Sequence, residues 1–305
     1  MRLVLRRVIN IWFLNGTEIP NTNSQTYSPT AAGWGTLRSN TTGSDNTAFG
    51  YSALYPNTTG NKNTAVGQGA LKNNSTGDEN SAFGEGALGN NQTGVYNSAF
   101  GREALHMNRG NNNTAFGWRA GFQTGSNNTS VGWQAGYSAG NNNTAIGAES
   151  NFAASNLTNA TAIGYQANVN ANNKIRLGNG SVTVIEGAVS FTAASDSRIK
   201  KNIVNSTYGL ATVLKLRPVE YNLTSNDLKQ VGFIAQEVQK LVPEVVTGKE
   251  GDISKGEILG ITYSNLVPVL TKAIQEQQKQ IEDQNAKIAA QQKQIEELIK
   301  LVKGQ

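Results

Sequence analysis

The chain has 305 residues, of which 37% are hydrophobic and 15% charged, and its formal net charge is +5. This composition is too polar for an ordinary globular enzyme, but the apolar residues recur at fixed places, which argues against disorder. Cysteine is absent and His106 is the single histidine. These counts exclude disulfides, a thiolate nucleophile and a Cys or His metal cluster, and they argue against a Ser-His-Asp triad. We therefore expect neither a metal nor a cofactor.

The positive charge is spread along the chain. Eleven basic and eight acidic residues precede Ser195, against fifteen and thirteen from Ser195 onward, so the two parts carry +3 and +2. Arg2, Arg6 and Arg7 form the one basic cluster. This distribution does not predict a nucleic-acid partner.

Residues 1–30 are predicted to form an extended lead-in. Residues 1–14 suggest a signal peptide, but Arg6, Arg7 and Asn10 interrupt the apolar run, and no small-residue cleavage site follows soon. No apolar run approaches about 18 residues, so no membrane span is expected. The sequence does not indicate an export route.

Residues 31–170 are a repeat region. Nine units each begin with a short segment that ends in glycine, and these glycines are 15 to 17 residues apart. Most of the segments have the sequence Asn-Thr/Ser-Ala-apolar-Gly, which we call the first step of the unit. The glycines are Gly33, Gly50, Gly67, Gly84, Gly101, Gly117, Gly132, Gly147 and Gly164. Near-identical units at a short period predict a solenoid.

Each unit contains a short strand, a second apolar step such as Ala53-Leu54, and an Asn/Gly/Thr turn such as residues 57–60. Two strands of about 4–5 residues and two turns fill one coil of a parallel β-roll. Alanine at the recurring inward position predicts a thin interior, too small to bury a useful core in one chain. We therefore expect parallel chains to associate, three being the favoured number.

Six aromatic residues recur in the repeats and have two interpretations. They could form a carbohydrate-binding stripe, but packing between stacked coils or chains is the favoured interpretation. The residues are Phe49, Phe83, Phe100, Phe116, Trp118 and Trp133. His106 is expected at the surface, in a turn.

Residues 171–194 form a connector in which the pairs Ile175/Leu177 and Val182/Val184 predict two short strands. Beyond it, residues 195–265 change in composition. We expect a short helix over 210–216, a strand over 219–223, a strand leading into a helix stopped by Pro243, and a strand over 258–263.

A long helix is predicted over residues 266–305, with Ser264 as its N-cap. Val or Ile recurs every seven residues from Val267 to Val302, and Leu or Gln follows three residues after each of the first five. This a/d pattern over five heptads predicts a coiled coil. A trimer suits the repeats best.

Two stretches of the chain resemble known families. The Asn-small-Ala-apolar-Gly steps resemble the heads of trimeric autotransporter adhesins, which are trimeric parallel β-rolls. The ordered motifs SDSRIKKNI, LRPVEYN, VGFIAQEVQKLVPEVV and ITYSNLVPVLTKAIQEQ closely resemble the endosialidase-type intramolecular chaperone domain. That domain ends phage tail fibres and tail spikes. The resemblance implies a domain that drives trimerisation and folding of the β-structure before it, then severs itself.

The same resemblance assigns roles around residue 195. It implies Ser195 as nucleophile, Lys200 as base, Asp196 and Arg198 as companions, and cleavage between Ala194 and Ser195. A serine needs a base to remove its proton, and with no histidine nearby a lysine can serve. Lys200 must then be neutral, through burial or neighbouring cations, so we expect cleavage only after assembly. The rival Ser-X-X-Lys pattern of penicillin-recognising enzymes begins at Ser197, but its partner motifs are absent.

The sequence thus predicts a mixed fold: a trimeric, adhesin-head-like β-solenoid, a small α+β chaperone domain and a long trimeric coiled coil. The favoured function is a phage tail-fibre-like or surface appendage protein matured by a single-turnover Ser-Lys self-cleavage. The alternative is a bacterial trimeric adhesin whose C-terminal domain is a permanent clamp. A host-surface carbohydrate or receptor is the candidate partner beside the homotrimer itself. A virion tail or a bacterial surface is the expected location.

Overall fold

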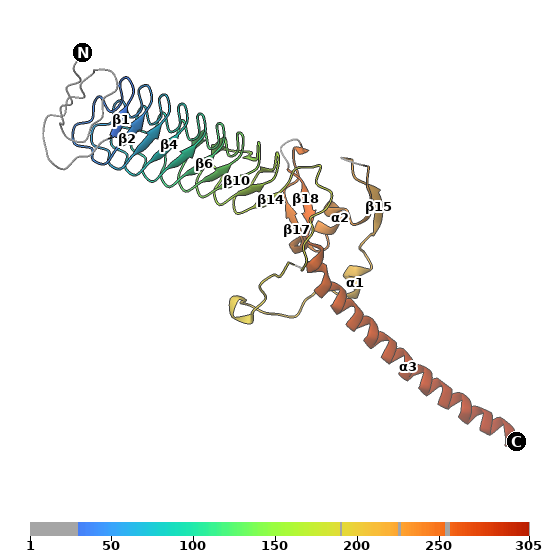
Figure 1. The fold of residues 1–305 in the computed structure, drawn as a ribbon. Helices are drawn as coiled ribbons and strands as arrows, with labels where there is room; N and C mark the ends of the chain where they lie inside the picture. The colour runs from blue at the N-terminus through green and yellow to red at the C-terminus, as the bar shows by residue number, and fades with distance from the viewer. Residues whose placement is uncertain (1–29, 190, 225–226, 254–256, 305) are drawn as a thin grey trace, which may run out of the picture. The chain divides into compact units, whose positions relative to one another are not determined.

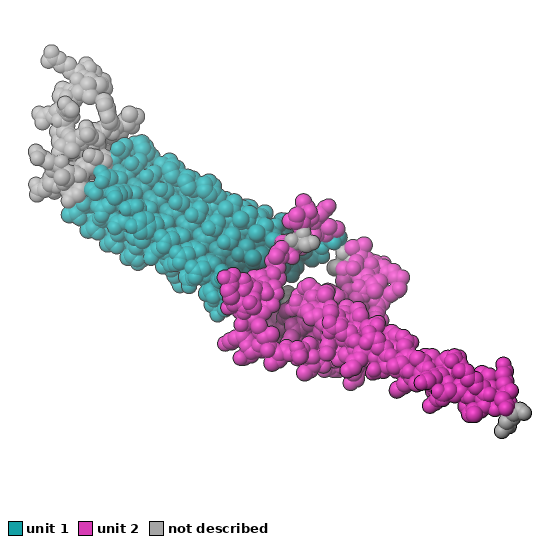
Figure 2. Space-filling model, turned by 90° about the horizontal axis from the view of Figure 1, so that it is seen from below, with its two compact units in different colours: residues 1–183 teal, residues 184–305 magenta. Residues whose placement is uncertain are grey.

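The computed structural model describes residues 30–189, 191–224, 227–253 and 257–304. The chain divides into two compact units, residues 1–183 and 184–305, which Figure 2 shows in different colours. Nearly all of the predicted lead-in, including Arg2, Arg6 and Arg7, lies outside the described residues. Each unit is described by itself below.

The first unit is a β-solenoid, as predicted. One short strand from each coil joins a ten-stranded parallel sheet, and the strands stack in chain order (Figure 1). Pairing is in register, so that Ala48 lies opposite Ala65 and Ala65 opposite Ala82. The strands are β1 (Thr30–Ala32), β2 (Thr47–Phe49), β3 (Thr64–Val66), β4 (Ser81–Phe83), β5 (Ser98–Phe100), β6 (Thr114–Phe116), β8 (Thr129–Val131), β10 (Thr144–Ile146), β12 (Thr161–Ile163) and β14 (Ile175–Leu177).

The second strand predicted for every coil is wrong for the early coils. There the Ala-Leu step lies in a turn, and the leucine takes a left-handed backbone, with φ of 50° at Leu54, Leu71 and Leu88. This conformation bends the chain while it keeps the leucine side chain inside. Two-residue second strands form only in later coils, as the pairs β7–β9 and β11–β13. They are β7 (Gln123–Thr124), β9 (Ser138–Ala139), β11 (Asn151–Phe152) and β13 (Asn168–Val169).

The solenoid interior is thin, as expected, yet it closes within one chain. The middle residue of each strand, mostly alanine, points inward, and nearly all of these residues and the recurring leucines are at most 2% exposed. Buried asparagines fill the remaining space. The expectation that one chain cannot bury a useful core is therefore wrong for this unit, because the inward alanines and leucines of successive coils pack into buried clusters.

A ladder of buried asparagines precedes the strands. Asn63 Oδ1 accepts the backbone N–H of Asn80 at 3.0 Å, and Asn80 Oδ1 accepts that of Asn97 at 3.0 Å. Asn80 Nδ2 donates to the carbonyl of Gly94 at 2.8 Å. The ladder satisfies the buried backbone groups at the strand starts, which would otherwise destabilise the fold. Its members are Asn46, Asn63, Asn80, Asn97, Asn113, Asn128 and Asn143.

The glycine that ends each first step allows the coils to stack closely. Gly84 has φ of 133°, and a Cβ added there would lie 2.6 Å from both the carbonyl carbon and oxygen of Gly101. Only glycine fits such a position. This explains why the repeat keeps glycine at this position.

The connector matches its prediction in part. Ile175 and Leu177 lie in β14, which adds one more coil to the stack. Val182 and Val184 lie outside any strand, so the second predicted strand is wrong.

The second unit is a small mixed fold followed by a long helix (Figure 1). The predicted helices and strands are present at slightly different bounds, and β15 pairs with β16, and β17 with β18, both antiparallel. The elements are α1 (Leu210–Val213), β15 (Val219–Asn222), β16 (Lys229–Gly232), α2 (Ala235–Gln239), η2 (Pro243–Val245), β17 (Val246–Gly248), β18 (Leu259–Ile261), η4 (Tyr263–Leu266) and α3 (Val267–Lys303).

The predicted N-cap of the long helix is wrong. Ser264 lies inside the 3₁₀ turn η4, and Leu266 occupies the N-cap position of α3 without a side-chain cap. The preceding turn supplies the helix start, so no capping hydroxyl is needed, and Pro268 is compatible with the first helical turn.

The core of the second unit is small. Val238, Val242, Val245, Leu266 and Val269 form its buried cluster. By contrast, the heptad row of α3 is exposed along its whole length in the single chain. This exposure is what a coiled-coil seam without its partner helices would give.

Candidate functional site

The predicted cleavage site lies in a segment without regular structure. Described residues 191–207 are all exposed, and the only element among them is η1 (Ser197–Ile199). Asp196 caps this 3₁₀ turn, because its Oδ1 accepts the backbone N–H of Arg198 at 2.8 Å. The cap fixes the chain direction immediately after Ser195.

The turn brings the predicted nucleophile and base together. Lys200 Nζ donates a hydrogen bond to Ser195 Oγ over 2.7 Å. The backbone N–H of Lys200 also bonds the carbonyl of Ser197 at 3.1 Å, which closes the turn that separates the two side chains. This distance suits proton transfer between a hydroxyl and an amine.

The two companions pair with each other. Arg198 Nη2 lies 2.6 Å from Asp196 Oδ2, and its Nε lies 3.0 Å from Oδ1. Hydrogen bonds from Arg198 lower the pKa of Asp196, and the same pair raises the pKa of Arg198. Arg198 is thus engaged by a carboxylate, and Asp196 offsets its positive charge beside Lys200.

In the single chain, the Ser195–Lys200 pair is open to solvent. A general base must accept a proton, so Lys200 would have to be neutral to take the proton of Ser195 Oγ. Ala194, Ser195 and Lys200 are all exposed to solvent. Burial is therefore the missing requirement for the predicted chemistry.

The apolar side chains in the stretch of sequence on either side of the dyad are uncovered. Phe191 is 91% exposed and Val204 is 85% exposed. The other apolar side chains of this segment are exposed as well: Val184, Ile185, Val189, Ile199 and Ile203. Such a concentration of uncovered apolar residues is typical of a surface that another chain covers.

Two polar pairs in the second unit escaped the sequence reasoning. Arg217 Nη2 lies 2.5 Å from Glu237 Oε1, so the pair links the LRPVEYN motif to α2. Tyr208 OH donates to the Glu244 carboxylate at 2.9 Å, which raises the pKa of Tyr208. Spacing alone gives no signal for either pair, because the partners are 20 and 36 residues apart.

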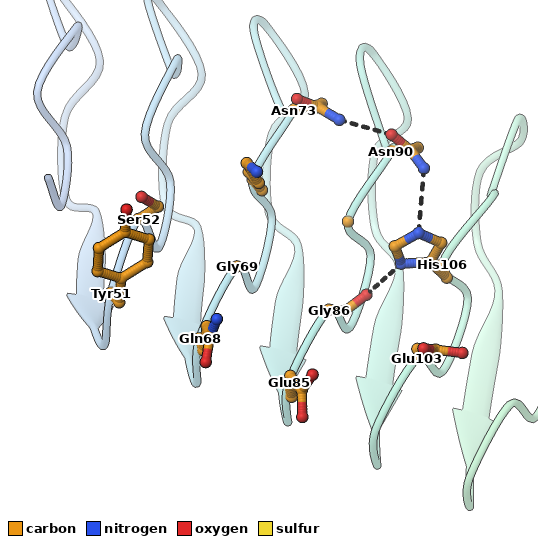
Figure 3. Close-up of a pocket in the computed structure, with 12 residues that line it drawn as sticks. Tyr51, Ser52, Gln68, Gly69, Asn73, Glu85, Gly86, Asn90, Glu103 and His106 are labelled. Carbon is orange, nitrogen blue, oxygen red and sulfur yellow. Dashed lines mark hydrogen bonds between the residues drawn. The ribbon is translucent and has the colours of Figure 1, made fainter.

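A polar groove of about 310 Å³ crosses four coils of the solenoid (Figure 3). Asn73 Nδ2 donates to Asn90 Oδ1 at 2.5 Å, and Asn90 Nδ2 lies 3.2 Å from His106 Nε2. His106 Nδ1 lies 2.8 Å from the Gly86 carbonyl oxygen. Tyr51 also lines the groove. As predicted, His106 lies in a turn, where it is partly exposed.

The six aromatic residues singled out in the repeats form two columns. Phe49, Phe83, Phe100 and Phe116 end their strands, whereas Trp118 and Trp133 lie beyond the glycine. Phe100 stacks on Phe83 and Phe116 at centroid distances of 4.9 and 4.4 Å, and the two tryptophans stack at 5.7 Å. Packing between stacked coils is therefore present.

Within the described residues, no helix has the length and apolar character needed to cross a membrane. The described His, Asp and Glu side chains also form no group of three that could hold a metal ion.

Residues 195–247 match the family model described as chaperone of endosialidase. The match begins at Ser195, so it includes the Ser195–Lys200 contact and the Arg217–Glu237 pair. No curated protein and no solved structure matches the chain.

Proposed function

We propose that this chain is one copy of a trimeric, tail-fibre-like or surface appendage protein. Its C-terminal unit acts as an intramolecular chaperone that aligns three chains, and it then releases itself by cleavage between Ala194 and Ser195. The observation that carries the proposal is the 2.7 Å contact between Lys200 Nζ and Ser195 Oγ at the start of the matched segment. The exposed heptad row of α3 supports the assembly step.

The proposed cleavage needs no diffusible substrate. Neutral Lys200 takes the proton of Ser195 Oγ, and the oxygen attacks the carbonyl carbon of Ala194. The Ala194–Ser195 C–N bond breaks, and the new amine of Ser195 takes the proton from Lys200. Water then hydrolyses the ester, which leaves the Ala194 carboxylate, the Ser195 hydroxyl and a new amino terminus.

Assembly would switch this reaction on. In one chain the dyad is exposed, and Lys200 Nζ lies 2.7 Å from Ser195 Oγ. Packing of three copies would cover the apolar residues around the dyad, remove water and favour the neutral amine. Cleavage would then follow folding, so a shaft that has not assembled would keep its chaperone.

The test compares the full chain with Ser195→Ala and Lys200→Met on a denaturing gel, with intact masses. Wild type should yield pieces 1–194 and 195–305, and both variants should stay intact. Ser197→Ala is the matched control, since this hydroxyl lies two residues away and begins the rival Ser-X-X-Lys pattern. Cleavage lost in Ser197→Ala but kept in Ser195→Ala would contradict the assignment.

A second candidate is a trimeric surface adhesin that keeps the C-terminal unit as a permanent clamp. The groove of Figure 3 favours it, because an aromatic ring beside amide and carboxylate groups can bind a carbohydrate. Its lining includes Tyr51, Gln68, Asn73, Asn90 and Glu85.

The two candidates differ in two measurements. An intact wild-type chain in a folded trimer would support the clamp and contradict the cleavage. Binding to a glycan array that Tyr51→Ala removes and Tyr96→Ala keeps would support the carbohydrate site. Tyr96 is a suitable control because it is similarly exposed but does not line the groove.

A further inference from the structure

The outer face of the ten-stranded sheet carries an uninterrupted apolar column. The third residue of each strand points outward, and most of these side chains are more than a third exposed. We define the apolar column as Ala32, Phe49, Val66, Phe83, Phe100, Phe116, Val131, Ile146, Ile163 and Leu177. Nine spacings of about 4.8 Å make this column about 43 Å long.

The face is also free of charge. The first residue of each strand lies beside the column, and in every strand of this sheet from β1 to β12 it is a threonine or serine. Charged residues flank the two columns instead: Arg102 and Glu85 lie 3.4 Å apart beyond the glycine, and Lys62 and Glu79 lie 3.4 Å apart two positions before their strands. Two identical faces can therefore approach each other without like charges meeting.

A parallel sheet is rarely bare on one face. Parallel sheets are almost always covered on both faces, and among the described residues only the inner side of its own coil covers this one. Contiguous exposed apolar surface of this extent usually marks an interaction site. A sugar would find few partners here, because the hydroxyls of threonine and serine are the only polar side-chain groups that the two columns offer.

We propose that this face packs against the same face of two other copies of the chain and holds the shaft together. The inference rests on the proposed function, because parallel α3 helices would bring equal coils of each copy to the same height. Identical columns would then meet residue by residue, Val131 beside Val131. The apolar contact would persist after the C-terminal unit is released.

Single-cysteine variants of the full chain test the inference, because the chain has no cysteine of its own. Val131→Cys places a thiol on the apolar column, and Gln123→Cys places one on a different, exposed side of the solenoid, in β7. A short bis-maleimide should link Val131→Cys into dimers, since each thiol reacts once. It should leave Gln123→Cys as single chains on a denaturing gel.

Light scattering of the same samples separates the possible failures. If the chain is a trimer and Val131→Cys gives no more cross-linked product than Gln123→Cys, the inference is wrong while the proposed assembly stands. If the chain is a monomer, the proposed assembly is wrong and the inference with it. A second variant, Val131→Glu, should release monomers of residues 1–194 after cleavage, whereas Gln123→Glu should not.

Discussion

The two units differ in what one chain can bury. Of the apolar residues that are buried in the described chain, 25 lie in the solenoid unit and only six in the C-terminal unit. The solenoid achieves this with alanine, leucine and paired asparagines inside each coil. The C-terminal unit leaves the α3 row and the cleavage segment uncovered.

Because of this difference, we expect folding of the solenoid and assembly through the C-terminal unit to depend on different contacts. A solenoid whose interior closes in one chain is stabilised by contacts between neighbouring coils. The C-terminal unit leaves apolar surface exposed in the single chain, so we predict that its state depends on association. A protease dyad placed in that unit can report assembly, whereas the same dyad inside the solenoid could not.

The largest effect is expected from charges in the coiled-coil row. Ile281→Asp combined with Ile288→Asp puts two carboxylates in the predicted seam, and burying unpaired charge there is strongly unfavourable. We expect loss of association by light scattering and a fall in cleavage of at least about 100-fold, which corresponds to about 2.7 kcal/mol. Ala286→Asp combined with Lys293→Asp, on the outer side of the helix, should change neither. Normal cleavage in the seam variant would break the link between assembly and cleavage.

The next effect is confined to the solenoid. Gly84→Ala adds a Cβ 2.6 Å from the Gly101 carbonyl, at a φ of 133°. Steric overlap and backbone strain should together lower the unfolding free energy by about 4 kcal/mol. Chemical denaturation followed by circular dichroism measures this. Gly180→Ala should have little effect, because nothing lies within 4 Å of its added Cβ. Equal losses in both variants would contradict close coil stacking as the cause.

The asparagine ladder should give a smaller loss. Asn80→Ala leaves the backbone N–H of Asn97 and the carbonyl of Gly94 without these partners. We expect about 2 kcal/mol of destabilisation. Asn73→Ala, at an exposed site, should cost less than about 0.5 kcal/mol in the same denaturation experiment. If both variants were equally stable, the ladder would not be the reason that the interior closes in one chain.

The smallest effect is electrostatic and depends on pH. A hydrogen bond from Arg119 holds the pKa of Glu103 below its usual range. A lowered acid pKa stabilises the fold above the unfolded value near about 4.3, and this stabilisation is lost as the pH falls through the folded value. Glu103→Gln should therefore cost up to about 1 kcal/mol at pH 7 and nothing at about pH 2.

Thermal melts of Glu103→Gln across this pH range provide the measurement. The control is Glu85→Gln, whose ion pair with Arg102 is more than half exposed and should contribute little. A loss that stays constant down to pH 2 would point to packing and away from charge.

The sequence predicts the solenoid because the period of the repeat is set by individual residues that recur at fixed positions. Gly84 and its equivalents, the inward alanines and the alternation of the strands all act locally, so the pattern specifies them. The ordered motifs after Ser195 likewise place the C-terminal elements to within a few residues. The contact between Ser195 and Lys200 was anticipated from the resemblance, and its chemistry stays a prediction.

The missed features depend on tertiary contacts. Leucine rarely adopts positive φ, so the Ala-Leu steps suggested strands where Leu71 and Leu88 form turns. The buried asparagines resembled ordinary turn residues, because their hydrogen bonds reach a residue 15 to 17 positions away. These asparagine side chains help to close the interior of the solenoid. The recurrence of asparagine before each strand was the signal that could have indicated it.

Because the strands keep a constant register, the number of coils sets the length of the solenoid. Coils of 17, 16 and 15 residues place their strands in the same pairing, as Phe83, Phe100, Phe116 and Val131 show in succession. Duplication of a single repeat would therefore lengthen the solenoid by about 4.8 Å and leave both of its ends unchanged. The reach of such a protein can grow or shrink in fixed steps without any redesign of its terminal parts.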